Sequence, residues 1–323
     1  ITIGGNISQD SGTVKLDGNF PTGSNNVALG DQALDDGSLS GNANTAIGFQ
    51  ALSENEGGGS NVAVGSGSLF SNTSASNNTA LGKDALYANT TGSEGTAVGQ
   101  GALSANTTGT QNTAVGRKAL EVNTTGAGNT AVGQRALDAN TTADNNTAVG
   151  RAALGANTTG NSNVAVGTNS LDANTTGGAN TAVGHQALTA NTTAADNTSV
   201  GYNSLVANTT GASNTAVGSG ALNANTTAGK NVAIGRIAMQ LNTTGIENVG
   251  IGYQALYSNT TANGNVSLGA YSLVTNQTGS NNVAVGKNAL YSSSSASNNT
   301  AVGHNSLLAN TTAAGNTAIG KDG

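Results

Sequence analysis

The chain has 323 residues, of which 8% are charged and 3% aromatic, with 48 glycines, one proline and no cysteine or tryptophan. The lack of cysteine excludes a disulfide scaffold and any thiolate metal site. Ten Lys and Arg against sixteen Asp and Glu are too few for a nucleic-acid or anionic-membrane surface, and no apolar run is long enough to cross a bilayer. Low charge with much Gly, Asn and Thr is also found in disordered chains, so the periodicity of the sequence decides the class.

Residues 1–24 form the first predicted region and lack the repeat that follows. Residues 13–16, Thr-Val-Lys-Leu, alternate apolar and polar side chains as a short strand does. We expect this region to cap the first coil. The alternative is a connector that docks on a neighbouring subunit.

Residues 25–323 are built from one repeat. Its marker is a glycine preceded by Asn, Thr or Val, Ala, and then Val, Ile or Leu, as in residues 112–116. The first interval between marker glycines is 18 residues and the sixteen later intervals are 17. With the marker glycine as position 0, the unit reads Gly-x-x-Ala/Ser-Leu-x-Ala-Asn-Thr-Thr-Gly/Ala-x-x-Asn-Thr/Val-Ala-Val. Repetition this strict predicts a solenoid.

The repeat favours an all-β fold, because it is too short for a helical hairpin and its Gly, Asn and Thr content opposes helix. We expect a parallel β-solenoid of 17-residue coils, each with two short strands and two turns. In the first strand Thr113 and Val115 share one face, opposite Ala114. In the second strand Leu103 and Ala105 share one face, opposite Ala102.

Stacking the coils in register predicts ladders, meaning columns of equivalent residues. The Leu at position +4 forms a core ladder that Met239 alone interrupts. Four of its members are Leu86, Leu103, Leu120 and Leu137. Two Asn ladders run beside it, one at the turn (Asn89, Asn106, Asn123) and one before the first strand (Asn112, Asn129, Asn146), and stacked amides can bond from coil to coil.

The first strand is apolar on both faces, which is typical of strands covered on both sides. Small residues allow close approach of backbones, so the Ala ladder is a candidate oligomer seam. Its members include Ala97, Ala114, Ala131 and Ala148.

The segment Asn-x-Ala-Val-Gly-x-x-Ala/Ser resembles the YadA-like head repeat of trimeric autotransporter adhesins. The Asn-Thr-Thr-Gly segment is similar to repeat arrays of bacterial surface and phage tail-fibre proteins. The resemblance covers residues 25–323, and the repeat here is longer than the head repeat. It implies a left-handed β-roll, a homotrimer with the Val-Ala-Val strand innermost, and an extracellular or cell-surface location, or alternatively a virion tail fibre.

Catalytic chemistry is not apparent in the sequence. His185 and His304 stand seven coils apart, and the acidic residues are dispersed, so we find no triad, carboxylate pair or metal-ligand cluster. Residues 315–321 resemble a phosphate loop, but Asp322 stands where Ser or Thr is required. We therefore expect no enzyme activity, no cofactor and no bound metal.

Aromatic side chains are the strongest candidates for surface contact. Four follow the core Leu or its equivalent, at Phe70, Tyr87, Tyr257 and Tyr291. Others follow the marker glycine, as Phe49, Tyr202 and Tyr253 do. Variable positions on one face of a repeat array can carry binding specificity, here towards a host receptor, matrix or glycan.

The chain stops directly after a predicted first strand, at residues 318–323. Either more chain follows or subunits stack end to end. The leading hypothesis is a non-enzymatic extracellular fibre module, structural or adhesive and trimeric. The alternatives are a filament built by end-to-end stacking, a phage tail-fibre shaft, and an ice-binding protein that orders water on the Thr-Thr ladder.

Overall fold

The computed structural model describes residues 24–323. The predicted cap or connector at 1–24 lies outside the described residues, except for Ser24. Internal contacts divide the chain into two units, one ending at Asn161 and one beginning at Ser162, and each is a parallel β-solenoid. No helix occurs within residues 24–323.

The first unit contains eight three-residue strands, paired in chain order. These are β1 (Val27–Leu29), β2 (Thr45–Ile47), β3 (Val62–Val64), β4 (Thr79–Leu81), β5 (Thr96–Val98), β6 (Thr113–Val115), β7 (Thr130–Val132) and β8 (Thr147–Val149). Every pair is parallel and in register, so that Ala97 in β5 faces Ala114 in β6.

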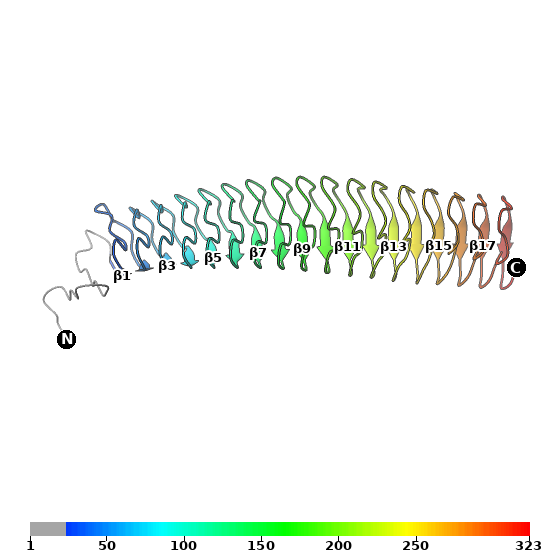
Figure 1. Cartoon of the computed structure of the whole chain (residues 1–323), viewed down its shortest axis with the longest axis horizontal. Helices are drawn as coiled ribbons and strands as arrows, with labels where there is room; N and C mark the ends of the chain where they lie inside the picture. The colour runs from blue at the N-terminus through cyan, green and yellow to red at the C-terminus, as the bar shows by residue number, and fades with distance from the viewer. Residues whose placement is uncertain (1–23) are drawn as a thin grey trace. The chain divides into compact units, whose positions relative to one another are not determined.

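The second unit contains ten strands with the same pairing. These are β9 (Val164–Val166), β10 (Thr181–Val183), β11 (Thr198–Val200), β12 (Thr215–Val217), β13 (Val232–Ile234), β14 (Val249–Ile251), β15 (Val266–Leu268), β16 (Val283–Val285), β17 (Thr300–Val302) and β18 (Thr317–Ile319). Within each unit the strands lie side by side along one edge of successive coils (Figure 1). The prediction of a parallel β-solenoid with 17-residue coils is confirmed.

The prediction of two strands per coil is wrong. The segment after the marker glycine is a chain of turns in which alternate residues adopt left-handed backbone angles, as Lys118 (φ 60°) and Leu120 (φ 51°) do. This geometry places Ala119 and Leu120, neighbours in sequence, both in the core. Strict alternation of faces therefore fails here. Each left-handed non-glycine residue costs about 1 kcal/mol. Two contributions offset this cost: burial of the Leu side chain, and hydrogen bonds between coils such as that from Leu120 N–H to Ala136 O (3.0 Å).

The core of each unit is a narrow column of Leu and Ala. Leu86, Leu103, Leu120 and Leu137 are all buried, in the interior position predicted for the Leu ladder. Ala at position −2 points at this column from the strand. The one coil that carries Met239 instead of Leu is followed by Gly250 instead of Ala, and a Cβ on Gly250 would lie 2.8 Å from Met239 Cγ. The larger side chain thus occupies the space of the missing methyl group.

Buried Ser pairs show a second compensation between positions. Ser199 replaces Ala in β11, and its hydroxyl lies 2.6 Å from the hydroxyl of Ser204 in the same coil. Ser267 and Ser272 repeat the pair in another coil. Each hydroxyl of these two pairs therefore has a hydrogen-bond partner in the core, which removes most of the cost of burying it.

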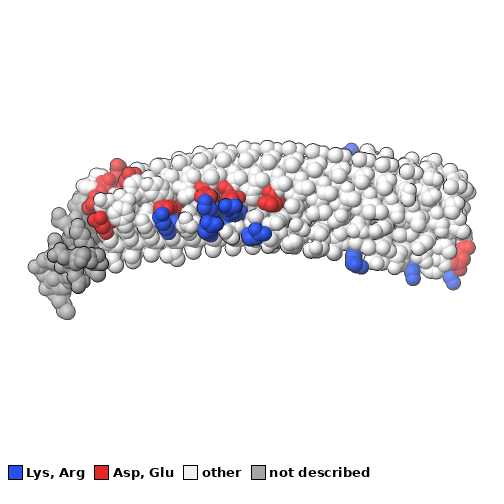
Figure 2. Space-filling view, in the orientation of Figure 1, with Lys and Arg blue, Asp and Glu red and all other residues white. Residues whose placement is uncertain are grey.

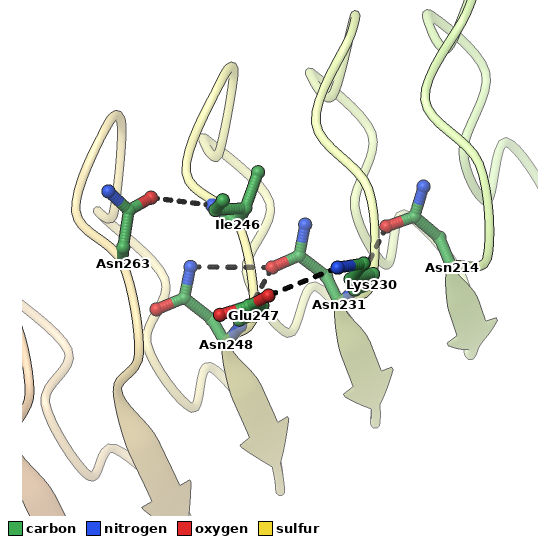
Figure 3. Close-up of polar contacts among 7 residues, drawn as sticks. All are labelled: Asn214, Lys230, Asn231, Ile246, Glu247, Asn248 and Asn263. Atoms are coloured by element: carbon green, nitrogen blue, oxygen red, sulfur yellow. Dashed lines mark hydrogen bonds and ion pairs between the residues drawn. The ribbon is translucent and has the colours of Figure 1, made fainter.

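Both Asn ladders are buried except in the first and last coils, and they bond from coil to coil within each unit, with one interruption each, at Gly95 before the strand and at Ser293 in the turn. In the turn ladder, Asn106 Nδ2 donates to Asn89 Oδ1 (2.8 Å) and to the carbonyl of Gly109 (2.9 Å). In the ladder before the strand, Asn231 Oδ1 accepts bonds from both the backbone N–H (3.0 Å) and the side-chain amide (3.3 Å) of Asn248 (Figure 3). The predicted stacking of amides is confirmed.

The marker glycine is required by backbone geometry and by close approach. Gly116 has φ +135°, and a Cβ there would lie 2.6 Å from the carbonyl oxygen of Gly133 in the next coil. Gly133 stands in the same relation to Gly150. Only glycine fits a corner at which neighbouring coils approach this closely.

Candidate functional surfaces

The outward face of the strands is the most regular surface of both units. Position −3 carries Thr or Val and position −1 carries Val, Ile or Leu, and these side chains point away from the core. Several are largely exposed, including Leu81 at 48% and Ile234 at 38%. A strand face that meets water normally carries polar residues, so this face has the composition of a covered one.

The Ala ladder does not form the predicted seam. Ala97, Ala114, Ala131 and Ala148 are 0% exposed, because they point inward at the Leu column of their own chain. A strand that is apolar on both faces is expected to be buried on both. Here the chain itself buries the Ala face. The face left for another molecule is the Thr/Val face.

The four aromatics predicted for surface contact lie on the coil surface, distributed over the two units. In the first unit Phe70 and Tyr87 stack with ring centroids 5.0 Å apart and an interplanar angle of 6°. Phe70 is half-buried, while Tyr87 is exposed and borders a shallow depression lined also by Lys118 and Glu121. In the second unit Tyr257 is half-buried and Tyr291 exposed.

Position +1, directly after the marker glycine, carries a second set of aromatics together with basic residues. In the second unit its members include His185, Tyr202, Arg236, Tyr253 and Lys287, all exposed. The carbonyl of each +1 residue accepts a bond from position +2 of the following coil, as His185 O does from Asn203 N–H (3.2 Å). These bonds hold the +1 residues in a column. The aromatics of this column were predicted for surface contact from the sequence; the basic residues between them were not, although the 17-residue spacing places both there.

Charge is distributed differently in the two units. Over the first unit, Lys and Arg lie beside Asp and Glu (Figure 2), with ion pairs that join Lys118 to Glu121 (2.8 Å) and Lys83 to Asp84 (3.5 Å). In the second unit Lys230 pairs with Glu247 (3.3 Å; Figure 3) at position +12. Arg236 and Lys287, in contrast, have no ion pair among residues 24–323.

The structure assembles none of the weaker sequence motifs into a site. His304 lies 3.9 Å from the carboxylate of Asp322, whereas His185 stacks on Tyr202 with centroids 5.6 Å apart. The segment that resembles a phosphate loop contains β18, so its backbone is engaged in the sheet. Among residues 24–323, no three His, Cys, Asp or Glu side chains are grouped to hold a metal, and no helix there could span a membrane.

A scan against known protein families finds none that matches the chain, and a comparison with curated proteins finds no match.

Proposed function

We propose that the chain is a non-enzymatic structural and adhesive module of an extracellular fibre, in which three copies pack their Thr/Val strand faces together. The single observation that carries the proposal is the outward strand face, with Thr or Val beside Val, Ile or Leu, which repeats in register at every strand of each unit and is at least partly exposed throughout. The resemblance of the repeat to YadA-like heads supports the number of copies, the left-handed coil and the surface location. A phage tail fibre would use the same construction.

Burial of this face between copies of the chain is more favourable in free energy than its exposure to water. Each coil contributes one Val, Ile or Leu and one Thr or Val, and these side chains lie about 4.8 Å from their equivalents in the next coil. Burying one such aliphatic side chain contributes about 1.5–3 kcal/mol. The gain accumulates along the array, because every coil presents the same pair of positions.

Cross-linking tests the proposal directly, because the chain has no natural cysteine. Val115→Cys places a thiol on the strand face, and Val122→Cys places one on an exposed position of the same coil away from that face. We expect Val115→Cys to form covalently linked copies under mild oxidation at low protein concentration, and Val122→Cys to remain uncrosslinked. Equal behaviour of the two variants would remove the proposed seam.

Ice binding is a second candidate, favoured by the position of the Thr side chains. Thr96, Thr113, Thr130 and Thr147 stand in consecutive strands on the outward face, one per coil. The Thr-Thr ladder is less suited, because its first hydroxyl is used between coils, as when Thr107 Oγ1 donates to Thr124 O (3.0 Å). Ice binding requires the strand face to be uncovered, so a monomeric chain with thermal hysteresis would favour it over the fibre.

A further inference from the structure

The second unit carries a line of aromatic and basic side chains, all exposed except the half-buried Tyr271, that the strand-face proposal does not use. We define it as the +1 strip, made of His185, Tyr202, Arg236, Tyr253, Tyr271 and Lys287. All occupy position +1 except Tyr271, which is at position +2 and meets Tyr253 edge to face with ring centroids 5.3 Å apart.

The aromatic rings of the strip are presented to solvent. Tyr202 is 58% exposed and stacks on His185 in the neighbouring coil at an interplanar angle of 14°, so the two rings lie nearly parallel and the side of Tyr202 turned away from His185 is open. Tyr253 is 37% exposed, with the Arg236 guanidinium 5.9 Å from its ring centroid. Exposed ring faces bind ligands that offer a flat array of C–H groups, as sugar rings do.

The charge of the strip has one sign. From His185 to Lys287, every residue at positions +1 and +2 is neutral, basic or His, and no Asp or Glu occurs at either position. Arg236 and Lys287 have no acidic partner in the described part of the chain. A guanidinium and an ammonium without an acidic partner on the same line select a ligand with carboxylate or sulfate groups.

We propose that the +1 strip binds a linear acidic polysaccharide that runs parallel to the stack of coils. Its sugar rings lie against Tyr202 and Tyr253, and its carboxylates pair with Arg236 and Lys287. Successive coils are about 4.8 Å apart, an advance comparable to that of one sugar ring along a polysaccharide.

This inference names the ligand of the proposed adhesive role and rests on that role for its biological meaning. The binding assay can fail while the copies still associate, and association can fail while the strip still binds, so the two failures are distinguishable. The probe is an oligogalacturonate, which is linear and has one carboxylate per sugar. Neutral maltodextrin and oligothymidylate of matched length are measured alongside it by calorimetry.

The strip variants are Tyr202→Ala with Tyr253→Ala, and Arg236→Gln with Lys287→Gln. The matched controls are Tyr291→Ala, an exposed aromatic at position +5, and Lys230→Gln, an exposed basic residue at position +12. Because all six side chains are on the surface, circular dichroism should show the same fold in each variant. We expect each strip variant to weaken oligogalacturonate binding about tenfold or more, the equivalent of one lost ring or ion contact.

The control variants should bind oligogalacturonate as the natural chain does. The proposal is overturned if oligogalacturonate does not bind, if maltodextrin binds equally well, or if the strip variants and the controls lose the same affinity. Tighter binding of oligothymidylate than of oligogalacturonate would overturn it in favour of a single-stranded nucleic-acid surface.

Discussion

The pairing of Met239 with Gly250 leads to a quantitative prediction about the core. Restoring the usual Ala by Gly250→Ala would place a Cβ 2.8 Å from Met239 Cγ and 3.1 Å from its sulfur, well inside the 3.5–4.0 Å or so at which carbon atoms attract. We expect the overpacking to cost about 1–3 kcal/mol. Met239→Leu alone leaves a gap beside Gly250 and should cost less than about 1.5 kcal/mol.

The double variant should recover the stability lost in the single variants. It recreates the Leu–Ala pair that Leu222 and Ala233 form in the neighbouring coils, so the interaction energy should be about 1–3 kcal/mol in favour of the double variant. Because repeat arrays do not unfold in one step, the assay is amide hydrogen exchange over residues 239–255 rather than a single unfolding midpoint. Losses that simply add in the double variant would refute the compensation.

Four further substitutions, one of them a control, test the backbone corner, the turn ladder and an acidic turn. Gly218→Ala should reduce exchange protection around it by about 100-fold, because strain and a clash with the backbone of the next coil cost about 3 kcal/mol. Gly220→Ala, which meets only side chains, should cost about 1 kcal/mol. Equal losses would contradict the backbone clash at Gly218. Ser293→Asn should stabilise its coil by about 1–3 kcal/mol, because Asn276 Oδ1 and the Ser293 hydroxyl have no hydrogen-bond partner among the described residues; unchanged hydrogen-exchange protection of that coil would count against this. The hydroxyl and then the backbone N–H of the serine two residues later lower the pKa of Asp36. The carboxylate is the favoured form in the fold, so its stabilisation is present above the ordinary pKa and lost as pH falls through the lowered one. Protection of that serine amide should follow this titration and become independent of pH in Asp36→Ala.

Much of the fold follows from the repeat itself. The marker glycine, the Leu ladder and the Asn ladders each occupy one position of a 17-residue unit, and parallel stacking in register leaves little choice about where they go. Leu120 and Asn106 therefore lie where periodicity predicts.

Local backbone geometry was harder to predict. Lys118 and Leu120 adopt left-handed angles that non-glycine residues seldom take, and no residue pattern predicts such a conformation for Leu. The prediction of a second strand failed for that reason. The assignment of Ala114 to an oligomer seam failed because the coil is narrow enough for a single chain to cover that side of the strand.

The candidate surfaces depended on knowing which side chains point outward. Periodicity alone places Tyr202 and Arg236 in one column, but the exposure of both and the lack of an acidic partner for Arg236 among residues 24–323 required the structure. The sequence showed that the strand is apolar on both faces. Only the structure shows that the Ala face is covered by the chain itself and that the Thr/Val face is uncovered.

The mass of the purified chain in solution tests the central claim most directly. Light scattering should give three times the 31.1 kDa chain mass. Val115→Asp with Val132→Asp on the strand face should reduce it to the mass of one chain, and Val122→Asp should leave it unchanged. A natural chain that runs at 31.1 kDa at all concentrations would contradict the account.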